Sequence, residues 1–420
     1  MKSSKPPRAS MFFSGGAYFI HFLSLGFASF PLQTHLRNAL TPSTASLITS
    51  VIPLAACLTY FFFRFAESRG WTRSPQRLLV ALASGVCLMQ LGMGLKLESI
   101  TAQSWWVSPG IDVAACLLLL GCVQSSCMTV LNHIGVATMG SHAYTVRAAG
   151  SAGYMLAVVV MGAIGASEKA VSQTHLFIGA AFSLLHVAFV LLSFRFVHWS
   201  KEHESSRSSS AILTSTSANS TNSHAGASKL SSEESLKWWG LLILVWMVAM
   251  CEMSYGLYAH EFLTTTYGSI GYFVFAGSIA LEIAILLAMP MFPALKQRLL
   301  FVGPAGWLTL LSGCLMALSG WPMMGFGAAA LALNCPFQVS ANEHAHRMRP
   351  SMLGIASMTL AQSIGYMSAT LLSAVVAAQG GGPARLWSIM IPIASTALAL
   401  SVWQMSRDRA IASRDALAAQ

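Results

Sequence analysis

Charged residues are scarce in this sequence. They make up 9% of the 420 residues, and hydrophobic residues make up 55%, whereas a typical soluble domain has about 25% charged residues. A soluble chain could not bury so much apolar surface, so a soluble globular protein is excluded. The short alternating segments that mark membrane β-barrels are also missing. The apolar residues instead form runs of about 18 or more, which predict membrane-spanning α-helices.

Catalytic and cofactor motifs are lacking as well. The glycine-rich stretches "GGAYF" and "QGGGP" are not followed by the Lys-Ser/Thr of a phosphate-binding loop. All eight cysteines lie inside apolar runs without metal-ligand spacing, and the histidine-containing stretch "NEHAHR" falls in a short predicted loop. We therefore expect no enzyme activity, no metal and no cofactor. We interpret the cysteines as small buried hydrophobic residues.

Twelve apolar runs are each about long enough to cross a ~30 Å hydrocarbon core. The predicted spans are residues 11–34, 43–63, 77–97, 109–132, 148–166, 174–197, 238–259, 269–289, 300–320, 322–341, 352–378 and 385–404. The sequence thus predicts an all-α membrane protein with twelve transmembrane helices. Basic residues before the first run resemble a signal peptide, but the run is long and no cleavage site follows it, so we expect an uncleaved first helix.

A polar segment divides the spans into six and six. Residues 198–237 are rich in Ser and Thr and poor in large apolar residues, which predicts a flexible cytoplasmic linker. The predicted organisation is a tail (1–10), a first six-helix bundle (11–197), the linker (198–237), a second bundle (238–404) and a second tail (405–420). Two six-helix halves around a site near the membrane midplane are the layout of many secondary transporters.

The basic residues are distributed unevenly over the two predicted sides. With the N-terminus in the cytoplasm, all but four of the 24 Lys and Arg residues fall in inside segments; the exceptions are Arg37, Lys96, Lys169 and Arg385. The positive-inside rule then places both termini in the cytoplasm. This asymmetry accounts for the formal net charge of +10 without a nucleic-acid partner.

Two carboxylates inside predicted spans are candidates for function. Glu252 lies in the seventh predicted span and Glu282 in the eighth. A charge near the centre of a membrane helix costs about 2.5–3.5 kcal/mol on insertion scales, and it persists where it faces a cavity or a partner. Either residue could therefore carry a proton or bind a hydroxyl-rich substrate. Alternatively, each could be a structural group bonded to a neighbouring Tyr or Ser.

A lone cation, Arg147, stands where the chain enters the fifth span, in "VRAAGSAGYMLA". The simplest interpretation is a topology anchor. If the fifth and eighth spans face each other, Arg147 and Glu282 could instead form an ion pair that closes the inner side, and exchanging the two charges should then restore function. His21 and His186 lie inside apolar spans, where interhelical hydrogen bonding is expected more often than proton relay.

Several stretches resemble a known family. Twelve spans, cytoplasmic termini and a long central loop resemble the major facilitator superfamily, and "FRFAESRGWTRSPQR" resembles a degenerate form of its loop 2–3 signature. Within that superfamily, "VRAAGSAGYMLA", "THLFIGAAFSLL", "SIALEIAILLAMP" and "RPSMLGIASMTLAQSIG" resemble bacterial nucleoside:proton symporters. The resemblance implies two six-helix bundles around a central substrate site.

The resemblance also implies site residues. Arg147, Ser151 and Tyr154 would line the pocket or gate, and Glu282 would meet substrate hydroxyls or take part in coupling. Asn334 falls about where that family has a membrane aspartate; because an amide cannot carry a proton, Glu282 and Glu252 are the candidates for coupling.

Other polar positions of that family's site are apolar here. The residues at or near them are Met253, Gly256 and Ile279. The substrate therefore need not be a nucleoside.

These observations predict a secondary active transporter. We expect a monomer in the bacterial inner membrane that moves a small polar solute, with a nucleoside favoured, by alternating access and proton symport. Its partners would be the small-molecule substrate, protons and the lipid bilayer. A sugar or an aromatic acid is the alternative substrate, and a non-transporting membrane sensor on the same scaffold is the alternative function.

Overall fold

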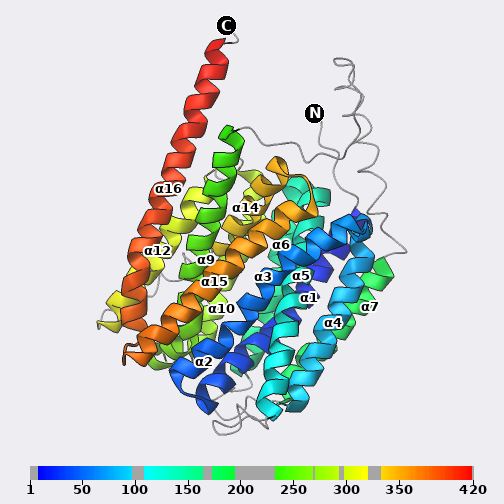
Figure 1. The fold of residues 1–420 in the computed structure, drawn as a ribbon, viewed down its shortest axis with the longest axis vertical. Helices are drawn as coiled ribbons and strands as arrows, with labels where there is room; N and C mark the ends of the chain where they lie inside the picture. Colours follow the sequence, from blue (N-terminus) through cyan, green and yellow to red (C-terminus); the bar gives the residue numbers. More distant parts are fainter. Residues whose placement is uncertain are drawn as a thin grey trace.

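The computed structural model describes residues 8–96, 108–163, 173–193, 232–267, 270–292, 298–319 and 333–418. These residues form helices, and no strand occurs among them (Figure 1). In chain order the elements are α1 (Arg8–Ala39), α2 (Pro42–Thr49), α3 (Val51–Ser68), η1 (Trp71–Arg73), α4 (Pro75–Lys96), α5 (Ser108–Met139), η3 (Gly140–His142), α6 (Ala143–Ala163), α7 (Gln173–Ser193), α9 (Ser232–Tyr267), α10 (Gly271–Ala288), η5 (Met289–Met291), α12 (Leu299–Leu318), α14 (Asn334–Met348), α15 (Met352–Ala378) and α16 (Pro383–Ala418). The predicted all-α class is confirmed.

Eleven segments in the described part of the chain are long and apolar enough to cross a membrane. They correspond to eleven of the twelve predicted spans, and α2 with α3 makes up the second of them. The tenth predicted span lies largely on residues 320–332, outside the described residues, and α14 follows directly after that segment. The predicted linker falls mainly on residues 194–231, which also lie outside the described part.

The second span is interrupted near one end. The α2 helix begins with a side-chain cap, because the hydroxyl of Thr41 accepts a hydrogen bond from the backbone N–H of Thr44 at 3.3 Å, and Pro42 occupies the first turn. A single residue, Ser50, separates α2 from α3. Pro53, which has no backbone N–H to donate, lies in the first turn of α3. Residues of both helices, among them Thr49 on α2 and Pro53 on α3, line the central cavity described below.

Several helices continue beyond the predicted spans. The α5 helix extends to Met139 and α6 begins at Ala143, so Arg147 lies within α6 and not at a loop. The stretch "NEHAHR", expected in a loop, is part of α14, and α16 continues to Ala418 through most of the predicted tail. Hydropathy marks only the part of a helix that crosses lipid, and it does not register polar turns at the helix ends.

The helices pack as two groups. The first group contains α1 to α7, in which α1 packs on α6 and α7, and α5 packs on α3 and α4. The second group contains α9 to α16, in which α9 packs on α15 and α16, and α12 packs on α16. The main contacts between the groups are made by α6 with α10 and by α15 with α2 and α3. These five contacting segments frame the space between the two halves.

One close contact occurs in both halves. Gly153 on α6 faces the backbone carbonyl of Phe19 on α1, and Gly365 on α15 faces the backbone carbonyl of Trp246 on α9. A Cβ atom at either glycine would collide with that backbone. A glycine thus lets α6 approach α1 closely in the first half, and a glycine lets α15 approach α9 closely in the second. The two halves repeat this contact although the sequence shows no strong internal repeat.

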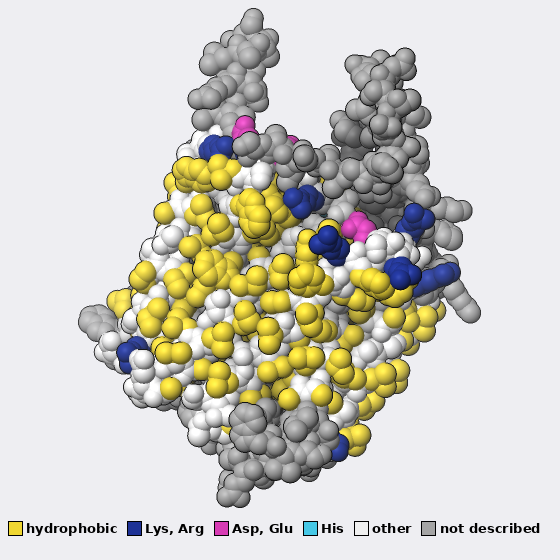
Figure 2. Space-filling model, in the orientation of Figure 1, with side chains coloured by type: hydrophobic (Ala, Val, Ile, Leu, Met, Phe, Trp, Pro, Cys, Tyr) yellow, Lys and Arg dark blue, Asp and Glu magenta, His cyan; other side chains and the backbone are white. Residues whose placement is uncertain are grey.

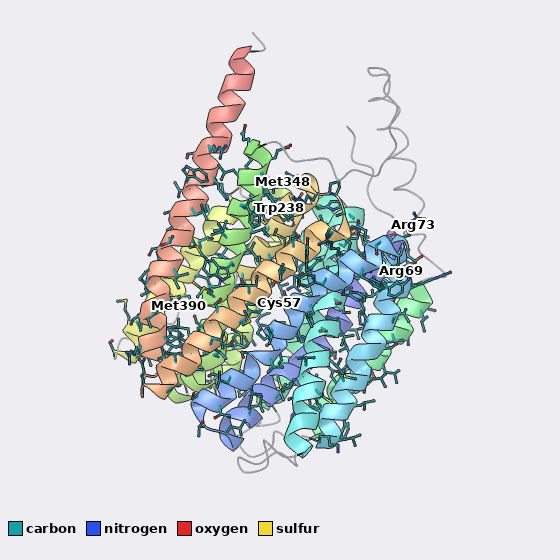
Figure 3. All side chains as sticks on the ribbon, in the orientation of Figure 1. Cys57, Arg69, Arg73, Trp238, Met348 and Met390 are labelled. Carbon is teal, nitrogen blue, oxygen red and sulfur yellow. The ribbon has the colours of Figure 1, made fainter. Side chains whose placement is uncertain are left out.

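The molecular surface separates apolar sides from charged ends. Large apolar side chains such as Phe61, Leu88 and Leu184 are exposed on the sides, as expected for residues that face lipid. Figure 2 shows hydrophobic side chains over most of this face and Lys and Arg mainly toward the upper end. Arg69 and Arg73 project from that end (Figure 3). We call the end where α1 begins and α16 ends the terminal end, and the other the opposite end.

Candidate functional site

A cavity of about 480 Å³ lies between the two halves. It is lined by α1, α2, α3, α5 and α6 from the first half and by α9, α10, α12, α14 and α15 from the second. The structure brings together at this cavity all the site residues predicted from the sequence, namely Arg147, Ser151, Tyr154, Glu252, Glu282 and Asn334. These residues come from four helices. The other residues of the lining are mostly apolar.

The spacing of three of these residues explains why they share one wall. Arg147, Ser151 and Tyr154 are separated by four and three positions on α6, and residues so spaced lie on one face of a helix. The ring of Tyr154 meets that of Phe275 on α10 edge-on, with centroids 6.4 Å apart. The α6 face therefore presents a cation, a hydroxyl and an aromatic ring to the cavity.

Arg147 is buried in the cavity wall, with only 6% of its surface exposed. Its guanidinium carbon lies 4.0 Å from the centroid of the Phe22 ring, which is a cation–π contact. Its Nη2 donates to the Sγ of Cys335 at 3.2 Å, while Nη1 has no hydrogen-bond partner among the described residues. Burial of this kind argues against a topology anchor at the membrane surface. A buried N–H donor without a partner is costly, so a rearrangement that gave Nη1 an acceptor would be favourable.

Glu282 is held across the interface between the halves. The hydroxyl of Ser151 on α6 donates to its Oε1 at 2.5 Å, and the carboxylate is 8% exposed. The Ser151 hydroxyl also lies 3.8 Å from the Sγ of Cys335. Glu282 thus has a partner from the other half, and it remains in the cavity lining with acceptor capacity to spare.

The expected ion pair between Arg147 and Glu282 is absent. Both residues reach the same part of the cavity, but the ion pairs found within the described ranges do not include one between them. Arg147 contacts Cys335, and Glu282 contacts Ser151. Cys335 and Ser151, which contact each other, link the two charged residues indirectly.

Glu252 on α9 has two amide partners on α14. Asn334 Nδ2 donates to Oε1 at 2.8 Å, and Gln338 Nε2 donates to Oε2 at 3.3 Å. The indole N–H of Trp307, which can only donate, points to Asn334 Oδ1 at 3.4 Å. This contact orients the Asn334 amide with its nitrogen toward the carboxylate. Tyr366 on α15 also hydrogen-bonds to this carboxylate, so Glu252 accepts from uncharged groups on two neighbouring helices.

Two further polar contacts at the cavity were not predicted from the sequence. Cys335 was interpreted as a small hydrophobic residue, and it is buried as expected, but its sulfur contacts both Arg147 and Ser151. Gln362 Nε2 donates to the hydroxyl of Tyr366 at 2.6 Å, and both side chains line the cavity. The i, i+4 spacing of that pair on α15 was its only signal in the sequence.

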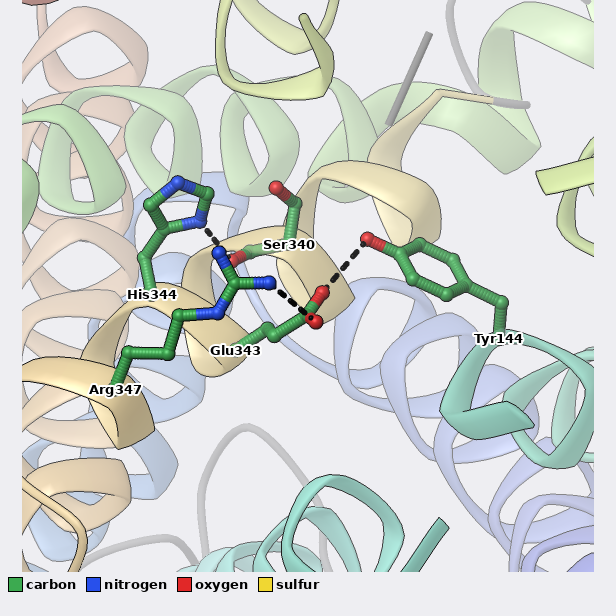
Figure 4. A network of polar contacts seen from close by, with 5 residues as sticks. All are labelled: Tyr144, Ser340, Glu343, His344 and Arg347. Atoms are coloured by element: carbon green, nitrogen blue, oxygen red, sulfur yellow. Dashed lines mark hydrogen bonds and ion pairs between the residues drawn. The ribbon is translucent and has the colours of Figure 1, made fainter. Parts of the chain in front are cut away.

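The halves are hydrogen-bonded to each other at the terminal end. The hydroxyl of Tyr144 on α6 donates to Glu343 Oε2 on α14 at 3.5 Å, and Arg347 pairs with Glu343 Oε1 at 2.8 Å (Figure 4). Thr129 on α5 and Thr359 on α15 also share a hydrogen bond of 2.8 Å between the halves.

A second contact joins the halves at the opposite end. The Ser46 hydroxyl on α2 lies 3.3 Å from that of Ser373 on α15, which in turn lies 3.2 Å from the hydroxyl of Tyr258 on α9. All three side chains are buried. The cavity is therefore flanked toward each end of the molecule by side chains that bridge the halves.

Comparison with known proteins finds likeness in structure alone. No protein-family model matches the sequence, and no curated protein matches it either. The crystal structure of the nucleoside transporter NupG is similar with a TM-score of 0.58 and 12% identity, over 94% of this chain and 98% of that chain. The structure of an aspartate-to-alanine mutant of NupG is similar with a TM-score of 0.59 and 13% identity, over 94% and 99% of the two chains. The protein is thus an integral membrane protein with the two-bundle fold of that transporter.

Proposed function

We propose that the protein is a secondary active transporter that moves a small polar solute, with a nucleoside as the favoured substrate, in symport with protons. The observation that carries this proposal is a largely apolar cavity with a few charged and polar side chains, which lies between two halves that are bridged toward both ends. Its volume of about 480 Å³ lies within the range of ~300–1,000 Å³ common for small-molecule sites. The fold shared with a nucleoside transporter supports the same reading.

The cavity lining suits the chemistry of a nucleoside. A nucleoside offers ribose hydroxyls that donate, base carbonyls that accept, and two apolar ring faces. Glu282 would accept from a ribose hydroxyl, and Nη1 of Arg147 would donate to a carbonyl or hydroxyl oxygen. Tyr154 and Phe275 would contact the ring. Glu282 and Nη1 of Arg147 can make these contacts in addition to the hydrogen bonds that the two side chains make within the protein.

Glu252 is the stronger candidate for the proton site. Asn334 cannot ionise, whereas the carboxylate that it contacts can. When Glu252 takes up a proton, one of its oxygens becomes a donor, and an amide N–H that donated to that oxygen loses its acceptor. The longer contact, from Gln338, is the one expected to break. Protonation at α9 would then alter the packing of α14 within the second half.

Transport would proceed by alternating access. The Tyr144–Glu343 contact and the Ser46–Ser373 contact would open in turn, exposing the cavity first to one side and then to the other. We further propose that the terminal end faces the cytoplasm of a bacterial cell, with the protein in the inner membrane as a monomer. The positive-inside distribution of Lys and Arg supports that orientation.

The direct test is transport by the purified protein in proteoliposomes. Counterflow of labelled uridine, adenosine or a sugar into preloaded vesicles identifies the solute without an imposed proton gradient. A pH gradient is then imposed to test proton coupling. We expect nucleoside exchange that saturates and accumulation that a proton uncoupler abolishes. Absence of exchange for every solute tested would favour a sensor that transports nothing.

An aromatic acid is the second candidate substrate, and one observation favours it. Nη1 of the buried Arg147 lacks a hydrogen-bond partner within the described residues, and a carboxylate is the strongest acceptor for a guanidinium. Counterflow of a labelled aromatic acid, measured beside that of labelled uridine, distinguishes the two. If the acid is exchanged and uridine is not, the solute is an anion.

A further inference from the structure

Three potential metal-ligating side chains meet inside the first half, away from the lining of the cavity. His21 on α1, Cys127 on α5 and His186 on α7 each offer one ligand atom, and these atoms all lie within 4.8 Å of one another. None is close to another in the sequence, so spacing could not reveal the group. The fold alone brings the three residues together.

The geometry of the group fits a small ion. The Nδ1 of His21 lies 3.7 Å from the Sγ of Cys127. Two ligands of one metal, with bonds near 2.1 Å to nitrogen and 2.3 Å to sulfur, lie about 3.6–3.8 Å apart. The two imidazole rings have centroids 5.4 Å apart, so a modest rotation of His186 would complete a three-coordinate site.

The hydrogen bonding of the group is incomplete. Nε2 of His21 and Nε2 of His186 are buried and have no hydrogen-bond partner within the described part of the chain. Both side chains, and that of Cys127, are almost fully buried. A neutral imidazole has one donor and one acceptor nitrogen, and leaving either unsatisfied in an apolar interior costs about 1–3 kcal/mol. Coordination at Nδ1 of His21, the atom beside Cys127, would leave Nε2 as the protonated nitrogen of that ring, so the unpartnered atom that an ion could engage is Nε2 of His186.

The charge of the site selects the metal. A thiolate and two neutral imidazoles carry a net charge of −1, so a monovalent ion gives a neutral site and a divalent ion leaves a buried positive charge. That excess would be costly in an apolar interior. Arg147 adds to the cost, because its guanidinium lies on Phe22, whose ring meets that of His21 at 5.7 Å. Thiolate and imidazole ligands together suit soft Cu(I).

We propose that His21, Cys127 and His186 bind one Cu(I) ion that joins α1, α5 and α7. The reaction is balanced by the loss of one proton: the Cys127 S–H bond breaks, a Cu–S bond forms, and the proton passes to water, with no change in oxidation state. Phe22 and Met128, the chain neighbours of two ligands, line the central cavity. The ion would therefore enter from the cavity past these two side chains. The site is independent of which solute is transported.

The test uses the full-length protein in detergent under anaerobic, reducing conditions. Cu(I) is supplied as a complex with a colorimetric bicinchoninate chelator, and the protein is expected to withdraw one equivalent of copper. X-ray absorption at the copper edge should show one sulfur and two nitrogen ligands, a measurement that needs no variant. A site with two or more sulfurs, or no withdrawal of copper, would overturn the proposal.

Variants then identify the ligands. Cys127→Ser, His21→Gln and His186→Gln should each lose the tightly bound equivalent, whereas the control Cys251→Ser, a buried cysteine of the second half, should keep it. Cu(I) should also raise the melting temperature of the control and leave that of the three variants unchanged. Equal copper binding by all four variants would mean adventitious thiol binding. Tighter retention of Zn²⁺ than of Cu(I) would overturn the choice of a monovalent ion.

Discussion

Asn334 on α14 donates a hydrogen bond of 2.8 Å to Glu252 on α9, so that an amide positions a buried carboxylate beside the cavity. The resemblance to nucleoside:proton symporters implies an aspartate where Asn334 stands. The acidic group is present in this protein, but it projects from the neighbouring helix. The ionisable group, Glu252, is therefore one hydrogen bond away from position 334, where the resemblance implies an aspartate.

Replacement of Glu252 by Gln should separate transport from proton coupling. The amide keeps the size of the side chain but cannot take up a proton, so we expect solute exchange by counterflow to continue and accumulation driven by a pH gradient to disappear. Both are measured in proteoliposomes with the same labelled solute. Glu233→Gln, a change at an exposed carboxylate in the first turn of α9, is the matched control and should behave like the native protein. Accumulation by the Glu252→Gln protein at the native level would remove Glu252 as the coupling site.

Replacement of Glu282 by Gln should weaken solute binding. A hydrogen bond to a charged group contributes about 1.5–3 kcal/mol, which corresponds to about 10–150-fold in affinity. Ser151→Ala removes a donor to the same carboxylate, and a smaller loss of about 2–10-fold is expected. Saturation curves for counterflow give both values. Equal and unchanged half-saturation in the two variants would place the solute elsewhere in the cavity.

The sequence predicted the fold because the fold depends on strong local signals, and the structure places the predicted site residues around one cavity. Long apolar runs fix the spans, and a charge such as Glu252 or Glu282 inside such a run is costly enough to indicate a cavity. Pairing within the site was not predictable in this way. Whether Arg147 faces Glu282 or Cys335 depends on the rotation and depth of α6 relative to α10 and α14, and hydropathy contains no information about either. The His21–Cys127–His186 group escaped notice for the same reason.

Exchange of the charges at positions 147 and 282 should fail to restore function. The sequence suggested a direct ion pair, for which Arg147→Glu combined with Glu282→Arg would be a conservative swap. In the structure the two groups are joined through Cys335, which contacts both of them, and not by a direct ion pair. Arg147 also lies on the Phe22 ring, and Glu282 also accepts from Ser151. The swap would place a carboxylate at position 147 against the face of the Phe22 ring. A carboxylate cannot make the cation–π contact that the guanidinium makes there.

The measurement is counterflow by the double variant and by each single variant. We expect all three to fall to background, with normal protein levels and monodisperse behaviour in detergent. Recovery of exchange in the double variant alone would show that a direct pair forms at some stage of the transport cycle.

A disulfide at the opposite end should stop transport reversibly. The hydroxyls of Ser46 and Ser373 lie 3.3 Å apart, and alternating access requires that contact to open once in each cycle. Cysteines in the combined variant Ser46→Cys, Ser373→Cys would be close enough for a bond of about 2.05 Å after small side-chain rotations. Oxidation should abolish exchange, and a reducing agent should restore it.

Leu47→Cys combined with Ser373→Cys is the matched control, because Leu47 belongs to the same helix but has a largely exposed side chain. If the oxidised Ser46→Cys, Ser373→Cys protein contains the disulfide by mass spectrometry and still exchanges solute at the native rate, the opposite end does not open during transport and the alternating-access mechanism proposed for this protein is wrong.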